Sequence, residues 1–238
     1  MIKIEHTEIV GWEATIRGMR NPMNSWDKSD TCFGDIFCGN CEECLPGKCG
    51  CEKARGKNGQ IGPLDLALMR KLRNSGTDHR KFMRMLVVYL DITAPLYWWK
   101  EFDTYRVGRA DNPMEIEMNS CSTMHKIAAK EFTPDDFSCE HLYELCGNTE
   151  VEKIQKGDYL PSSVLSQCII PCLNQCRKLY LATNNKIWWW QMIQLLPSSY
   201  NQKRTIMLNY EVLANIYKSR HNHKLIEWHI FCDWIESL

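Results

Sequence analysis

The apolar segment MRMLVVYLDIT, at residues 83–93, restricts the possible folds of this chain more than any other feature. A run of this length that is rich in β-branched residues predicts a strand buried on at least one face, and such a strand has to pair within a sheet. Pro95 follows the run, and the next residues, LYWWKEFDTYR, combine aromatic and charged side chains on a predicted helix. The chain therefore contains at least a small sheet, with an aromatic-rich helix directly after one strand.

Most of the other periodic segments predict helices. A short strand followed by a helix is expected over residues 2–19, and the segment from Pro63 to Gly76 has the proline start and glycine stop typical of a helix. Further helices are predicted at residues 119–132, 133–147, 162–183 with a kink at Pro171, 187–196, 205–220 and 225–238. The sequence thus predicts a mostly helical protein with a small sheet.

The composition is that of one globular domain spanning residues 1–238, because 44% of the residues are hydrophobic and 24% are charged. The 29 acidic and 29 basic residues cancel, which argues against a strong field for nucleic acids or membranes. No apolar run reaches the roughly 18 residues of a membrane span, and the charges near the start are unlike a signal peptide. We therefore expect a cytoplasmic protein whose thiols stay reduced.

Residues 32–60 are rich in cysteine and glycine and hold too few large apolar side chains to bury a core of their own. Six cysteines follow the pattern C-x5-C-x2-C-x2-C-x4-C-x-C, and closely spaced thiolates suit tetrahedral zinc. An iron–sulfur site and free or oxidised thiols are the alternatives, since the spacing misses that of ferredoxins. The candidate metal ligands are Cys38, Cys41, Cys44, Cys49 and Cys51. We expect a metal-binding insertion here.

Three further cysteines, Cys168, Cys172 and Cys176, recur every four residues on one predicted helix. Closely spaced thiols on a helix suit a metal or redox site, but free cysteine more commonly serves as a small buried hydrophobic group. We expect the second role for these three residues.

Several polar segments lie at characteristic distances from two prolines. Arg106 follows Pro95 by eleven residues, and Asn209 follows Pro197 by twelve. The segment TDHRKF precedes the predicted central strand, and NSCSTMHK follows the aromatic-rich helix. In this order and spacing the chain resembles the flavin-dependent thymidylate synthase (ThyX) family over most of residues 60–235.

The resemblance assigns family positions to individual residues in the first half of that region. His79 falls on the family's flavin-side histidine, and Arg106 falls on the last arginine of its Arg-His-Arg segment. Asn119 and Ser122 match the asparagine and the second serine of the Ser-x-Asn-Glu-x-Ser-x-Arg-Tyr motif, in which Ser120 replaces the glutamate. These residues are therefore candidates for holding the flavin and a nucleotide phosphate.

The second half carries the family's Asn-x-Arg-x-x-x-Asn pattern. Asn209 and Asn215 match its two asparagines, and Arg220 matches the arginine that in the family holds the uracil base and its developing charge. By this resemblance Arg220 is the candidate catalytic residue, because a fixed cation near a carbonyl polarises the base. The candidate substrate-binding residues are Arg106, Ser120, Ser122 and Arg220, and the candidate cofactor-binding residues are His79, Asn119, Asn209 and Asn215.

Several family residues are missing from this chain. The departures are Thr104 and Tyr105 for two basic residues, Met124 for an arginine, His125 for a tyrosine and Glu211 for an arginine. Four cations are lost, and each charge-assisted contact to a phosphate contributes roughly 1.5–3 kcal/mol. Either other cations compensate, or the substrate has changed, or catalysis has been lost. The candidates for compensation are Arg80, Arg84, Lys100, Arg109 and Lys126.

The resemblance implies an α/β fold, helix-rich with a small, mostly antiparallel sheet. It also implies methylation of dUMP to dTMP with FAD, NADPH and methylenetetrahydrofolate, in a homotetramer whose sites draw on several subunits. The tryptophans at 98, 99 and 188–190 would then stack on a flavin or, as is more usual, fill the core or a subunit contact. The alternative function is a binding protein that holds flavin or nucleotide without turnover. A weaker alternative is that the cysteine-rich insertion recruits a nucleic acid or another protein.

Each candidate residue also has a purely structural interpretation. Arg220 would stabilise the C-terminal end of its helix, where a cation suits the helix dipole. Asn119 and Ser122 would be caps or turn residues, and His79 would be a solvated residue that follows a helix. Asn is a poor residue for a helix interior, so the expected position of Asn209 and Asn215 within one helix hints at a polar pocket.

Overall fold

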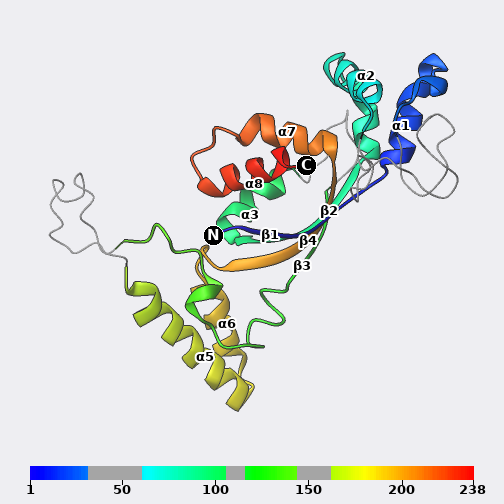
Figure 1. The fold of residues 1–238 in the computed structure, drawn as a ribbon. Coiled ribbons are helices and arrows are strands. Elements are labelled where there is room, and N and C mark those ends of the chain that lie inside the picture. Colours follow the sequence, from blue (N-terminus) through cyan, green and yellow to red (C-terminus); the bar gives the residue numbers. More distant parts are fainter. Residues whose placement is uncertain (32–60, 106–115, 144–161) are drawn as a thin grey trace, which may run out of the picture. The chain divides into compact units, whose positions relative to one another are not determined.

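The computed structural model describes residues 1–31, 61–105, 116–143 and 162–238 (Figure 1). Its sheet is antiparallel and has the strand order β1-β2-β4-β3. The strands are β1 (Lys3–Val10), β2 (Val87–Pro95), β3 (Glu117–Ser120) and β4 (Asn201–Asn209). The α-helices are α1 (Trp12–Arg20), α2 (Pro63–Asn74), α3 (Leu96–Phe102), α5 (Ile170–Thr183), α6 (Lys186–Leu195), α7 (Tyr210–Arg220) and α8 (Ile226–Glu236). The predicted fold class, helix-rich with a small antiparallel sheet, is confirmed.

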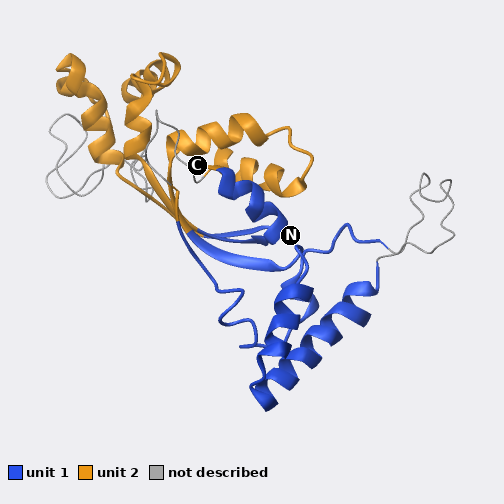
Figure 2. Cartoon of the chain, turned by 180° about the vertical axis from the view of Figure 1, so that it is seen from behind, with its two compact units in different colours: residues 1–5, 91–104, 118–205 blue, residues 6–90, 105–117, 206–238 orange. Residues whose placement is uncertain are grey.

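The chain divides into two compact units, which Figure 2 shows in different colours. Unit 1 comprises residues 1–5, 91–104 and 118–205, and unit 2 comprises residues 6–90, 105–117 and 206–238. The division cuts each strand, so that each unit holds one part of every strand. None of the helices in the described ranges is long and apolar enough to cross a membrane.

The core of unit 1 lies around helices α5 and α6, which pack against each other. Phe132, Phe137, Leu173 and Met192 are among its buried side chains. In α3, the indole of Trp99 is buried and its Nε1 donates to the carbonyl of Gln202, 2.9 Å away. Burying the aromatic face of α3 provides a large hydrophobic contribution, because each such ring removes 150–250 Å² or so from water.

Asp103, one of the charged residues that follow the tryptophans in the sequence, also lies in unit 1 and pairs with Arg204 of strand β4. The guanidinium of Arg204 lies 4.2 Å from the centre of the Trp99 ring, and its Nη1 donates to Asp103 at 2.7 Å. An arginine suits this place because its flat, weakly hydrated cation stacks on an aromatic face while it pairs with a carboxylate. Here the combination of aromatic and charged residues holds α3 to strand β4.

The core of unit 2 is built around a 3-10 helix at Arg80–Met85, which contacts α1, α2 and α7. Ile16, Met69, Phe82 and Leu86 are buried in this core. Gly11 enters α1 with a φ of +98°, and a Cβ there would lie only 2.4 Å from the carbonyl oxygen of Met85. Only glycine fits this close approach at low cost.

Two predicted helices are wrong. Residues 119–132 begin with strand β3 and continue as turns, in which the Ser122 Oγ accepts hydrogen bonds from the backbone N–H groups of Met124 and His125. Side chains of this kind offer the backbone an alternative to a helix. In the segment 133–143, the only helical part that the structure describes is the 3-10 turn Pro134–Asp136.

The predicted helix at residues 205–220 is correct only from Tyr210 onward. Strand β4 continues to Asn209, with Ile206 and Leu208 buried, before α7 begins at Tyr210. Alternating burial is the pattern of a strand, and the helical periodicity of the later residues concealed it. Consequently Asn209 is a helix cap and does not lie within the helix as predicted.

The long predicted helix at residues 162–183 contains a π-helical turn, Leu165–Ile169, directly before α5. Pro171 lies in the first turn of α5, where a missing N–H is tolerated. Of the three cysteines expected to be buried on this helix, only Cys176 is buried, while Cys168 and Cys172 are exposed. That prediction is therefore wrong for two of the three residues.

Candidate functional site

Helix α7 supplies more side chains to the candidate site than any other described element does. Asn209 caps its start, because the Oδ1 atom accepts a hydrogen bond from the N–H of Val212 at 3.0 Å. Glu211 lies in the first turn, and Lys218 and Arg220 lie in the last turn. This distribution places negative charge at the N-terminal end and positive charge at the C-terminal end, as the helix dipole favours.

Glu211 joins α7 to the 3-10 helix through two arginines. Its Oε1 accepts from the Nε of Arg80 at 2.9 Å, and its Oε2 accepts from the Nε of Arg84. The glutamate side chain is only 3% exposed, whereas Arg80 and Arg84 are 33% and 24% exposed. A carboxylate buried to this degree needs charged partners. The two arginines supply them and keep part of their own surface in solvent.

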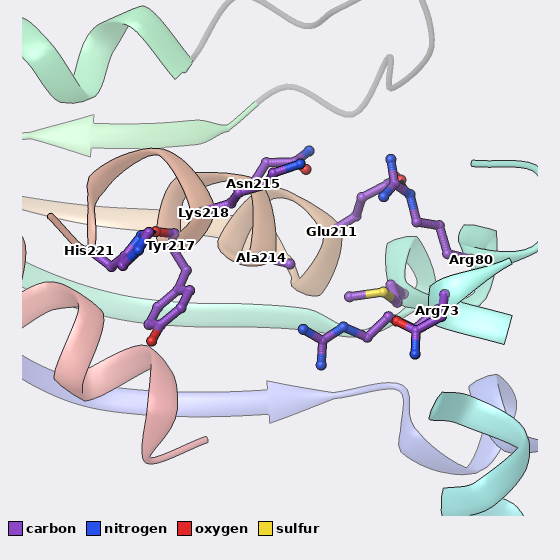
Figure 3. Close-up of a pocket in the computed structure, with 10 residues that line it drawn as sticks. Arg73, Arg80, Glu211, Ala214, Asn215, Tyr217, Lys218 and His221 are labelled. Atoms are coloured by element: carbon purple, nitrogen blue, oxygen red, sulfur yellow. Dashed lines mark hydrogen bonds and ion pairs between the residues drawn. The ribbon is translucent and has the colours of Figure 1, made fainter. Parts of the chain in front are cut away.

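A cavity of about 340 Å³ opens beside this ion-pair cluster (Figure 3). It lies within unit 2, between the end of α2, the start of the 3-10 helix and one face of α7. Its lining residues are Arg73, Asn74, Arg80, Met83, Glu211, Ala214, Asn215, Tyr217, Lys218 and His221. Figure 3 shows Arg80 beside Glu211, with Asn215 and Lys218 on the same helix as the glutamate.

The cavity wall combines cations with a flat aromatic pair. Arg73, Arg80 and Lys218 outnumber the single carboxylate, Glu211, so the cavity favours a negatively charged guest. At the other end, the rings of Tyr217 and His221 are stacked with centroids 5.4 Å apart and planes inclined by 12°. The site can therefore hold an anionic group and a flat ring at separate places.

Two tyrosines of helix α7 have pKa values above the ordinary value for a tyrosine. A hydrogen bond to the carboxylate of Glu236 is the main cause that raises the pKa of Tyr217 above its ordinary value of 10.0. Burial raises the pKa of Tyr210 to about 12. Both phenols therefore stay protonated at neutral pH, and neither serves as a base there.

Arg220, the predicted catalytic residue, lies at the last position of α7 and does not line the cavity. Its Nε donates to the hydroxyl of Tyr105 at 2.7 Å. Its guanidinium carbon lies 4.8 Å from the ring centre of Trp228 and 5.4 Å from that of Tyr105. The arginine is thus held against two aromatic rings whose planes are inclined by 67° to each other, an arrangement that fixes its orientation.

The other predicted residues of unit 2 lie at three different places. Asn215 is exposed and lines the cavity. His79 is exposed and immediately precedes the 3-10 helix that carries Arg80. Asn209 is buried at the start of α7, and its Nδ2 donor has no hydrogen-bond partner among the residues that the structure describes.

The remaining predictions concern unit 1 or lie outside the described ranges. Asn119 and Ser120 are exposed residues of strand β3, and Ser122 forms the turn that follows this strand. Arg106 and the five candidate metal ligands Cys38, Cys41, Cys44, Cys49 and Cys51 lie outside the described residues. Within the described ranges, no three His, Cys, Asp or Glu side chains are grouped so that they could hold a metal ion.

The sequence analysis missed most of the cavity. Arg73, Lys218, Tyr217 and His221 were not candidates, since each alone looks like an ordinary charged or aromatic residue near the end of a helix. The usable signal was Glu211, which the resemblance placed where the family has an arginine, so that a replacement cation was expected nearby. Arg80 was named as a possible replacement cation, and the structure pairs it with this glutamate.

The fold has clear counterparts among solved structures. The flavin-dependent thymidylate synthase ThyX from Helicobacter pylori, solved with FAD and dUMP, matches 98% of this chain and 90% of its own, with a TM-score of 0.56 and 13% identity. The UMP/dUMP methylase PolB from Streptomyces cacaoi, bound with 5-Br dUMP, matches 100% of this chain and 88% of its own, with a TM-score of 0.57 and 12% identity. No protein-family model matches the sequence, and no curated protein matches it. This chain therefore has the ThyX fold.

Proposed function

We propose that this protein binds a flavin nucleotide and a uridine nucleotide, and that it methylates dUMP with reduced FAD, NADPH and methylenetetrahydrofolate. The observation that carries the proposal is the positively charged cavity along α7, which includes Asn215, in a fold that ThyX from Helicobacter pylori, solved with FAD and dUMP, also has. A fold alone does not establish an activity. The proposal therefore depends on the chemistry of the residues present.

These residues suit a flavin nucleotide. Arg80 and Lys218 offer cations to phosphate groups, and Asn215 offers an amide to a ribityl or ring oxygen. The buried Nδ2 of Asn209 is a donor that the described residues leave without an acceptor, as expected of a group that pairs with a ligand. The flavin would supply the redox chemistry, and the side chains would orient it.

In this proposal Arg220 polarises the uracil base. Its contact with the Tyr105 hydroxyl and its position against Trp228 support that role, because a preorganised cation stabilises developing charge without reorienting. The proposed phosphate ligands are Arg106, Ser120 and Ser122, and the proposed flavin contacts are His79, Asn119, Asn209 and Asn215. We also propose a cytoplasmic homotetramer that does not act on nucleic acids.

Two measurements test the proposal. Freshly purified protein should show flavin absorbance, or bind added FAD, and it should oxidise NADPH only when dUMP is present. Arg220→Ala should abolish the dUMP-dependent oxidation and leave FAD bound, whereas Arg17→Ala, a change in an exposed cation of α1, should leave both unchanged. Normal turnover in the Arg220→Ala variant would refute the polarising role.

One observation favours the second candidate function, a binding protein without turnover. Glu211 occupies a position at which the resemblance predicts an arginine, so that the local charge is reversed. If the protein binds FAD and dUMP but never oxidises NADPH in their presence, this second function is correct.

We further propose that residues 32–60 form a zinc-binding insertion whose ligands are among Cys38, Cys41, Cys44, Cys49 and Cys51. The residues that flank the segment lie close together, since the N–H of Gly62 donates to the Thr31 Oγ1 at 3.0 Å. An insertion that begins and ends at one point leaves the surrounding fold intact. Metal analysis should find about one zinc per chain, and a metal-free protein would exclude the site.

A further inference from the structure

Arg80, which lines the cavity, uses only part of its hydrogen-bonding capacity in its ion pair with Glu211. Arg80 contacts Glu211 through its Nε, and its Nη2 lies 3.5 Å from the Thr77 Oγ1, at the limit of a hydrogen bond. Among the described residues no other partner of its terminal nitrogens is found. Since arginine carries five N–H donors, the side chain retains donors at its terminal nitrogens, and Arg80 is one of the residues that line the cavity (Figure 3).

Arg84 provides an internal comparison. It contacts the other oxygen of Glu211 through its own Nε and comes from the same 3-10 helix, but it does not line the cavity. The two arginines therefore share one carboxylate and differ in whether a ligand in the cavity can reach them. Glu211, with one arginine on each oxygen, fixes the direction of both guanidinium groups.

This arrangement prepares Arg80 to bind an anion. A guanidinium matches the geometry of a phosphate group through two parallel N–H donors. A carboxylate at the Nε restricts the side chain before the ligand arrives, so less conformational entropy is lost on binding. Arg73 and Lys218, which also line the cavity, add point charges around the same space.

We infer that Arg80, oriented by Glu211, binds a phosphate group of the nucleotide ligand and supplies the cation that is missing from position 211. The identity of the nucleotide rests on the proposed function. The role of Arg80 in binding a phosphate group does not depend on it. Arg80 is the residue that contacts the ligand, and Glu211 is a positioning residue. The phosphate belongs to a flavin nucleotide or to a uridine nucleotide, and the experiment distinguishes these sources.

The test measures binding to the full-length protein by titration calorimetry with inorganic pyrophosphate, FAD, riboflavin and dUMP. Arg80→Gln should weaken pyrophosphate binding by about tenfold to a hundredfold, the value of one charge-assisted contact. It should weaken either FAD or dUMP to a similar degree, which identifies the source of the phosphate, and leave riboflavin, which has no phosphate, unchanged. Arg84→Gln, the matched control, should change none of these affinities by more than about twofold.

Two further variants separate positioning from folding. Arg80→Lys keeps the charge but not the fork, so it should recover part of the lost affinity. Glu211→Gln should weaken pyrophosphate binding less than Arg80→Gln does, because the contacting cation remains and only its orienting partner is lost. Unfolding curves of all variants show whether each one is folded.

The outcomes are distinct. Pyrophosphate binding that is absent in the parent protein, or equal in the parent and the Arg80→Gln variant, overturns the inference. An equal loss in the Arg84→Gln variant also overturns it, because the cluster would then serve only the fold. If pyrophosphate binding depends on Arg80 but neither FAD nor dUMP binds, the role of Arg80 stands and the proposed function fails.

Discussion

Two buried carboxylates of unit 2, Asp65 and Glu211, both bind arginine, yet their surroundings differ. Asp65 is fully buried, and its partner Arg20 is only 5% exposed. Glu211 is buried too, but its partners Arg80 and Arg84 are 33% and 24% exposed, and Arg80 lines the cavity. The comparison separates a carboxylate that holds the fold together from one that holds side chains ready for a ligand.

Every donor around Asp65 comes from the protein itself. Its Oδ1 accepts from the Arg20 Nε at 2.7 Å, and its Oδ2 accepts from the Ser29 Oγ, the Asp30 N–H and both the N–H and the hydroxyl of Thr31. In return Asp30 caps α2 by accepting from the N–H groups of Leu64 and Asp65. A carboxylate satisfied in this way has no remaining capacity for a ligand.

The largest expected effect therefore comes from Asp65→Ala. Removing one partner of a fully buried ion pair leaves the Arg20 cation uncompensated, and the free energy of unfolding should fall by about 3–5 kcal/mol. Glu211→Ala should cost clearly less, about 1–2 kcal/mol, because Arg80 and Arg84 can turn their charges to water. Urea denaturation of both variants measures the difference. Equal losses would show that the two carboxylates play the same structural part.

A smaller effect should appear in the pH dependence of stability. Burial by itself raises the pKa of Asp65, but hydrogen bonds from Thr31, Ser29 and Arg20, with the charge of Arg20, outweigh it and hold the pKa below its ordinary value of 3.8. The folded protein thus binds this proton less readily than the unfolded chain does. The resulting stability is fully present above about pH 4 and is lost as the pH falls through the lowered pKa.

Asp65→Asn removes this titration. Below about pH 4, the parent protein should lose more stability per pH unit than the variant loses, so that the difference between their unfolding free energies narrows on acidification. Chemical denaturation of both proteins between pH 7 and pH 3 tests this. Parallel curves over the whole range would contradict a lowered pKa at Asp65.

The sequence predicted the helices and strands better than it predicted the residues of the candidate site. Strand β2 and helices α2, α7 and α8 follow from local periodicity and from residues that start or stop a helix, all of which lie within the element. Strand β3 could not be predicted in this way, because its pairing with β4 is decided by residues about 80 positions away. At the start of the segment 119–132, the Ser122 hydroxyl bonds to the backbone locally and competes with a helix.

The candidate site was hard to predict because it depends on contacts between residues that are far apart in the sequence. Arg80 and Glu211 are separated by 131 positions, so their contact leaves no pattern in either segment. The resemblance supplied the positions of Asn209, Glu211 and Asn215 on or next to one helix, and only the structure assigns them a cap, an ion-pair cluster and a cavity wall. Motif spacing thus located the helix, and side-chain packing decided what each residue does on it.

The smallest expected effect concerns a third carboxylate, Glu236, which lies on the surface and pairs with the Tyr217 hydroxyl. Because this pair is exposed, water replaces either partner, and Glu236→Gln should leave the midpoint of urea denaturation unchanged. The pKa of Tyr217, raised mainly by this hydrogen bond, should nevertheless fall toward 10.0. Ultraviolet titration against Tyr217→Phe isolates the signal of this tyrosine. A large loss of stability in Glu236→Gln would break the ranking, because it would mean that exposure does not decide how strongly a carboxylate of unit 2 supports the fold.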